Sequence, residues 1–142
     1  MRYLTLVLAL LAISIPGCSP RPGSTQTGSS SENDQILQRA FEQRTRSLQV
    51  EGRGVVKQIL PDDIKGSRHQ RFILELDSGQ TLLVTHNIDL APRIFDVHEG
   101  DDVTFNGVYE WNPEGGVIHW THHDPDGRHP GGWLKHNGKT YQ

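Results

Sequence analysis

Residues 97–109 read VHEGDDVTFNGVY, and this stretch decides the fold that we expect for the chain. An acidic turn containing Gly100 comes first. The residues after the turn alternate, so that Val103, Phe105 and Gly107 fall on one side of an extended segment. A period of two with one apolar side predicts a β-strand that buries that side.

Segments before and after this strand have the same period. Gly-rich or polar turns separate them, and the dipeptide Asn137-Gly138 between the last two is a strong β-hairpin signal. The strands that we expect cover residues 50–60, 71–77, 81–86, 103–109, 117–122, 133–136 and 139–142. Five or more short strands over about 90 residues favour a mainly β fold, a small barrel that is closed or partly open.

One helix is expected ahead of the strands, beginning near Asn33 or Asp34. Ser31 and Asp34 stand at capping-box spacing. Apolar residues then recur at helical intervals, namely Ile36, Leu37, Ala40, Phe41 and Leu48. We expect this stripe to pack on the β domain; a partner or a membrane is the alternative.

The N-terminus has the features of an export signal. Residues 1–17 carry one positive charge and an apolar run that is too short for a permanent membrane span of about 20 residues. Residues 15–19, IPGCS, resemble a bacterial lipobox, which makes Cys18 the lipidation candidate; a plain signal peptide with an incidental Cys is the alternative. Residues 18–33 are then a flexible tether, and residues 34–142 form the domain.

Composition and the export signal limit the classes of function. The chain has 142 residues, one Cys and a formal net charge of −3, which excludes a multi-domain protein and a disulfide scaffold and makes nucleic acid an unlikely partner. The lipobox resemblance implies anchoring in the bacterial cell envelope, and Ser19 after the Cys implies the outer membrane, facing the periplasm. The expected partners are the membrane, reached through the lipid anchor, and a small ligand or another envelope protein.

Five of the eight His lie in the C-terminal third, between positions 119 and 136. Imidazole and carboxylate groups suit zinc and similar divalent metals. The candidate metal ligands are His119, His122, His123, Asp124 and His129. Their spacing matches no zinc-finger or HExxH pattern, so hydrogen-bonded structural His and solvated His remain alternatives.

Aromatic residues gather in the same third of the chain. Beside His and Gly they predict a stacking surface for a small ligand. The candidate ligand-binding residues are Tyr109, Trp111, Trp120, Trp133 and His136. The alternative is that Trp120 and Trp133 belong to the core.

We therefore expect a binding module for a small ligand or a metal. The enzyme alternative is a metal-dependent hydrolase, with a phosphodiester as one substrate, that uses the same His/Asp cluster. Such an enzyme needs an open metal position and a base such as Asp124, Asp126 or Glu114. A third role is acid sensing, because the eight His would gain charge between pH 7 and pH 5.

Two resemblances add to this interpretation. The Glu99-Gly100-Asp101 turn and the alternating residues after it resemble the fourth strand of OB-fold domains, which implies a small OB-like β-barrel with one N-terminal helix. Residues 109–112 (YEWN), 119–125 (HWTHHDP) and 132–141 (GWLKHNGKTY) resemble a family of bacterial exported domains of unknown function, DUF3465, over residues 50–142. That resemblance implies an OB-like envelope domain and supplies no activity or site residue.

Overall fold

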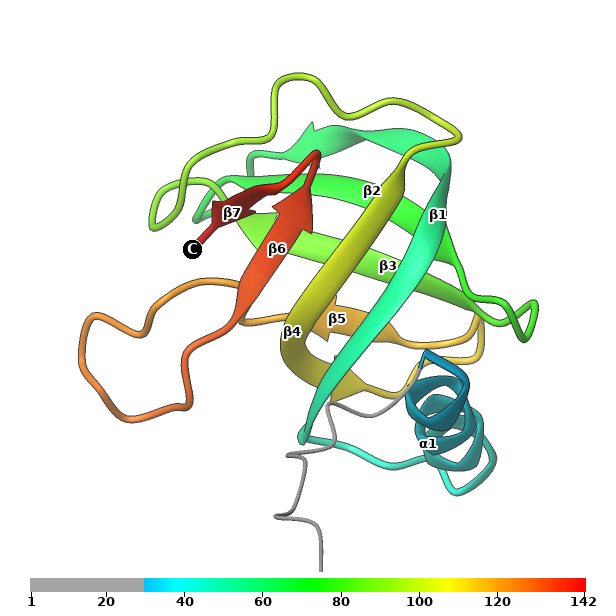
Figure 1. Cartoon of the computed structure of the whole chain (residues 1–142). Helices are drawn as coiled ribbons and strands as arrows, with labels where there is room; N and C mark the ends of the chain where they lie inside the picture. The colour runs from blue at the N-terminus through cyan, green and yellow to red at the C-terminus, as the bar shows by residue number, and fades with distance from the viewer. Residues whose placement is uncertain (1–29) are drawn as a thin grey trace, which may run out of the picture.

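The computed structural model describes residues 30–142 of the chain, without the side chain of Ser30. Helix α1 (Ser30–Glu42) precedes seven strands (Figure 1). The strands are β1 (Leu48–Asp63), β2 (His69–Glu75), β3 (Thr81–Asn87), β4 (Asp102–Glu110), β5 (Val117–His119), β6 (Trp133–His136) and β7 (Lys139–Tyr141). The prediction of a mainly β chain with one N-terminal helix is therefore confirmed.

The strands form one mixed sheet in the order β1-β2-β3-β5-β4-β6-β7. An additional antiparallel pairing joins β1 to β4, so hydrogen bonds run in a ring through β1, β2, β3, β5 and β4. All pairings are antiparallel except the short one between β3 and β5. Strands β6 and β7 extend the sheet outside the ring, because β6 pairs with the first half of β4.

Strand β1 is long enough to pair with both of its neighbours in the ring, β4 and β2. Its first half pairs with β4 from Leu48 to Val55, and its second half pairs with β2 from Val55 to Asp63. Close packing of β1 on the core requires Gly52, since a Cβ atom there would lie 2.5 Å from the ring of Phe105. The pairing of β1 with β4 is regular through Gly52 and Gly54, and the irregularities of this strand lie in its pairing with β2, between Val56 and Gln58 and between Leu60 and Asp63.

The core fills the inside of the ring. The buried faces of β2, β3 and β4 alternate with exposed ones, as the period of two predicts. Leu37 and Ala40 of α1 belong to the same hydrophobic cluster, which confirms that the helix packs on the β domain. The largest fully buried apolar side chains are those of Tyr109, Phe72, Phe105, Leu37, Leu74, Leu82, Ile94, Ile118 and Leu134.

The strand boundaries mostly lie within three residues of the sequence-based prediction, and three differences have a consequence for the local fold. The helix begins at Ser30, and Leu48, expected on its apolar stripe, is the first residue of β1. The chain leaves the helical path before Leu48 because Arg44 and Ser47 have left-handed backbone angles. The strand expected over residues 117–122 ends at His119, since Trp120 has a φ of 55°.

The predicted signal peptide, the lipidation candidate Cys18 and most of the predicted tether lie outside the described residues. In the part of the chain that the structure describes, no helix is both long and apolar enough to cross a membrane.

Candidate ligand pocket

The backbone at Trp120 shapes the site. Its left-handed φ ends β5 and turns the following residues back toward the sheet. Thr121 and His122 are consequently buried, although polar residues after a strand end are usually solvated. The strand expected over residues 117–122 therefore ends before Thr121, and the backbone turn at Trp120 directs the next two side chains inward.

A cavity of about 190 Å³ lies beside this turn. Its walls come from β2, β3, β5 and the segments that follow β3 and β5. Three of the lining side chains are imidazoles. The lining residues are His69, Thr85, Asn87, Leu90, His119, Trp120 and His122.

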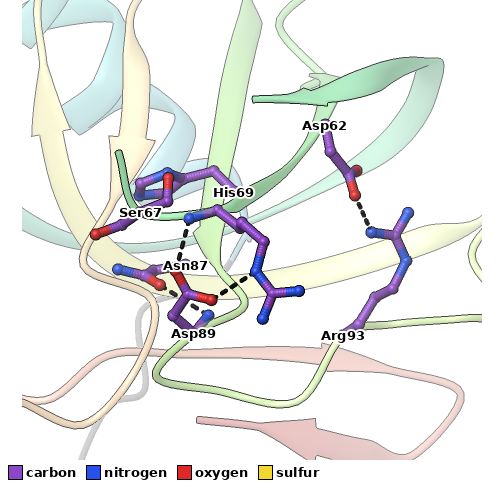
Figure 2. A network of polar contacts seen from close by, with 7 residues as sticks. Asp62, Ser67, His69, Asn87, Asp89 and Arg93 are labelled. Atoms are coloured by element: carbon purple, nitrogen blue, oxygen red, sulfur yellow. Dashed lines mark hydrogen bonds and ion pairs between the residues drawn. The ribbon is translucent and has the colours of Figure 1, made fainter. Parts of the chain in front are cut away.

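Backbone carbonyl groups fix the proton positions on two of these rings. Nδ1 of His69 lies 2.8 Å from the carbonyl oxygen of Ser67, and Nδ1 of His122 lies 2.6 Å from that of His123. A carbonyl only accepts, so Nδ1 carries the proton in both rings. In the neutral form each ring then keeps its lone pair on Nε2. Figure 2 shows His69 close to Ser67 and Asn87.

His119 presents an unpaired nitrogen. Its Nε2 atom is buried and has no hydrogen-bond partner among the described residues. Burial lowers the pKa of His119, and the negative charge of Glu110 only partly opposes this shift. Leaving a buried polar atom unpaired costs about 1–3 kcal/mol, so the pocket contains a group that a ligand could satisfy.

His86 joins the segments that follow β3 and β5, which also contribute residues to the pocket walls. Its Nε2 donates to the carbonyl oxygen of Pro92 at 3.1 Å, so Nδ1 accepts from the hydroxyl of Thr121 at 2.8 Å. Burial lowers the pKa of His86 to about 4, which keeps the ring neutral at pH 7. The segment after β5 and the loop after β3 are thus held together by one neutral, fully buried imidazole.

The other predicted metal ligands have different positions. Asp124 accepts the backbone N–H groups of Asp126, Arg128 and His129, which closes its own loop and lowers its pKa. His123 and His129 are exposed, and the ring of His129 packs on Trp120 with centroids 4.4 Å apart. Among residues 30–142, no group of three or more His, Cys, Asp or Glu is arranged to hold a metal ion.

The predicted aromatic residues are spread over the molecule, and only Trp120 lines the pocket. Tyr109 is a fully buried core residue, since β4 directs it inward. Trp111 stacks on Phe41 of α1, while Trp133 lies under the ammonium group of Lys135. The five candidates therefore do not form one stacking surface.

His136 lies away from the pocket as well. It is fully buried in β6, and its Nε2 lies 2.9 Å from a carboxylate oxygen of Asp101. This contact ties the C-terminal hairpin to the turn before β4. A structural role accounts for its burial.

Sequence reasoning missed four residues that line the pocket: His69, Thr85, Asn87 and Leu90. The hairpin signal at residues 77–80 sets the register that places His69 opposite Asn87, so this pair could have been found. The parallel pairing of β3 with β5, which brings His119 to them, leaves no local sequence signal.

Comparison with known proteins assigns the chain to a protein family. The profile of a family described as a protein of unknown function, DUF3465, matches residues 23–142. The chain belongs to the DUF3465 family. No curated protein matches it. The match includes every residue of the pocket, so the pocket lies within the DUF3465 domain.

Proposed function

We propose that this DUF3465 protein is a binding module for a small ligand that carries N–H donors. The observation that carries the proposal is the convergence of His69, His119 and His122 on one cavity, with a buried Nε2 of His119 unpaired. A ligand N–H placed against that nitrogen would remove the cost of leaving it unsatisfied.

The chemistry of the lining favours a small and positively charged ligand. The tautomers of His69 and His122 leave acceptors, rather than donors, available in their neutral rings. The ring of Trp120 adds an aromatic face, which attracts cations. The volume of about 190 Å³ is well below the roughly 300–1,000 Å³ of pockets for drug-sized ligands.

The proposal includes the setting of the domain. The ring of five hydrogen-bonded strands supports the interpretation as an OB-like barrel, with β6 and β7 as an addition. The lipobox-like residues around Cys18 support a lipid anchor in the bacterial envelope, at the outer membrane and facing the periplasm. The ligand would then be one that reaches that compartment.

Zinc is the second candidate ligand, and one observation favours it. Metal-bound His rings usually donate the other ring N–H to a carbonyl or carboxylate, as His69 and His122 do here. The three His rings would have to move closer together on binding zinc, because among residues 30–142 no group of three or more His, Cys, Asp or Glu is arranged to hold a metal ion. The hydrolase alternative depends on this candidate, since its nucleophile would be a metal-activated water.

The test is a titration of the full chain, with Cys18→Ser to prevent lipid attachment, against methylguanidinium and separately against zinc chloride. Long-range ¹H–¹⁵N NMR spectra report the state of each His ring nitrogen. We expect methylguanidinium to shift the ring signals of His69, His119 and His122. The exposed His123 is the matched control, so His123→Ala should bind normally while His119→Ala loses binding.

Each outcome separates the two ligands. Shifts with methylguanidinium that disappear in His119→Ala support the cation-binding module. Stoichiometric zinc uptake that is lost in His119→Ala and His122→Ala, without any response to methylguanidinium, favours the metal instead. A chain that responds to neither probe at these rings contradicts the proposed site.

A further inference from the structure

A second cavity, of about 430 Å³, lies between α1 and the two turns β2–β3 and β4–β5. Figure 1 shows α1 at the same end of the molecule as these turns. The cavity shares no lining residue with the His pocket. Its volume falls within the roughly 300–1,000 Å³ of small-molecule sites.

The walls of this cavity are tied to one another. Asp34 of α1 accepts the backbone N–H of Ser78 at 3.1 Å, which holds the helix on the β2–β3 turn. The hydroxyl of Thr81 donates to the carbonyl oxygen of Glu114 at 3.1 Å, which holds the two turns together. A side chain at Gly115 would collide with the backbone of Thr81, so the turns can approach this closely only with glycine there. The cavity is therefore built into the fold.

Gln80, in one wall, holds a buried hydrogen-bond acceptor without a partner among residues 30–142. The side-chain nitrogen of Gln80 donates to the carbonyl oxygen of Gly115 at 2.8 Å, which fixes the orientation of the amide. Its Oε1 atom is buried and has no hydrogen-bond partner among residues 30–142. An amide oxygen only accepts, so the group that completes this site must be a donor.

Besides Gln80 and the neutral polar residues Gln38 and Thr81, the lining contains two carboxylates and two apolar side chains. Glu42 and Glu114 face no ion-pair partner within the described residues, since neither takes part in any of the salt bridges found there. Phe41 and Pro113 supply the apolar surface of the lining. A ligand that matches this lining has a cationic N–H donor at one end and a short apolar stem.

We propose that the cavity between α1 and the β2–β3 and β4–β5 turns binds a guanidinium or ammonium group on a short aliphatic stem, the chemistry of a basic amino-acid side chain. The N–H groups of the ligand donate to Oε1 of Gln80 and to the carboxylates of Glu42 and Glu114. The stem lies against Phe41 and Pro113. This site is independent of the His pocket.

The test compares two amino-acid amides of the same shape. N-acetyl-arginine amide carries the charge, and N-acetyl-citrulline amide does not. In ¹H–¹⁵N spectra of the full Cys18→Ser chain, we expect the arginine compound to shift the side-chain amide of Gln80 and the backbone amides of Gly79 and Gly115. Citrulline should bind about tenfold more weakly, because hydrogen bonds to charged groups are about twice as strong as neutral ones.

Variants assign the binding to this cavity. Glu114→Gln and Glu42→Gln should each weaken the arginine compound several-fold, whereas Glu51→Gln, an exposed carboxylate on β1, should not. His119→Ala should leave this binding unchanged, which separates the test from that of the His pocket. Equal binding of the two compounds, shifts confined to other residues, or no shift at about 10 mM, where even millimolar affinity would be visible, overturns the proposal.

Discussion

His86 gives the domain a dependence on pH that a single residue controls. Its pKa is lowered from 6.5 to about 4 by burial, so the unfolded chain binds a proton before the folded one does. Neutral His86 therefore makes its full contribution to the free energy of unfolding above pH 6.5. This contribution is lost as the pH falls from 6.5 toward 4, by up to about 3 kcal/mol. His119, with its lowered pKa, acts in the same direction.

We therefore expect His86→Gln to flatten this profile. The amide can still donate and accept but does not titrate. Urea unfolding at pH 7 and at pH 4.5 should show a smaller loss of unfolding free energy for the variant than for the unchanged chain. Equal losses in the two proteins would contradict a role for His86 in the pH dependence.

Gly52 tests how closely β1 packs on the core. A Cβ atom at this position would lie 2.5 Å from Phe105, whose ring is fully buried and cannot easily move. Gly52→Ala should lower the free energy of unfolding by about 1–3 kcal/mol, the usual cost of overpacking a core. Gly131→Ala is the control, because a Cβ there would meet its nearest neighbour at 3.4 Å. Thermal unfolding of both variants compares their midpoints. Equal midpoints would show that the ring of Phe105 moves aside without loss of stability.

At the scale of elements, α1 depends on the β domain for its stability. Leu37 is fully buried in the shared hydrophobic cluster, so Leu37→Ala should cost about 2–5 kcal/mol. Gln35→Ala, on the exposed side of the same helix, should change the stability by no more than about 0.5 kcal/mol. Denaturant unfolding followed by circular dichroism compares them. If Leu37→Ala unfolds like Gln35→Ala, the helix does not share the core.

The strands could be predicted from the sequence because their periods and turns are local. The hairpin at residues 77–80 and the Asn137-Gly138 turn both lie where the pattern places them. The ring depends instead on pairings between distant segments, such as Leu48 with Tyr109, that no local pattern encodes. For the same reason, the hairpin register could reveal His69 and the His-rich segment could reveal His119 and His122, but no local pattern predicts that the three converge on one cavity.

At the scale of the whole molecule, the proposed lipid anchor would decide where the domain meets its ligand. A periplasmic, lipid-anchored domain would meet its ligand at a membrane surface. Two or more acyl chains on one protein anchor it there stably. Cys18 is the only residue that could carry that anchor, since the chain has a single Cys. The hydrophobic cluster among residues 30–142 joins α1 to the strands, and we expect the domain to fold without the anchor.

Cys18→Ser should consequently change the location of the protein and leave its fold intact. When the full chain is expressed in a bacterium, we expect the unchanged protein in the membrane fraction, with an N-terminal peptide whose mass includes acyl chains on Cys18. The variant should appear in the soluble periplasmic fraction with the same thermal midpoint. Ser19→Ala, beside the anchor, serves as the control and should stay in the membrane fraction. A soluble, unmodified wild-type protein would favour the plain signal peptide, and the ligand would then be met away from the membrane.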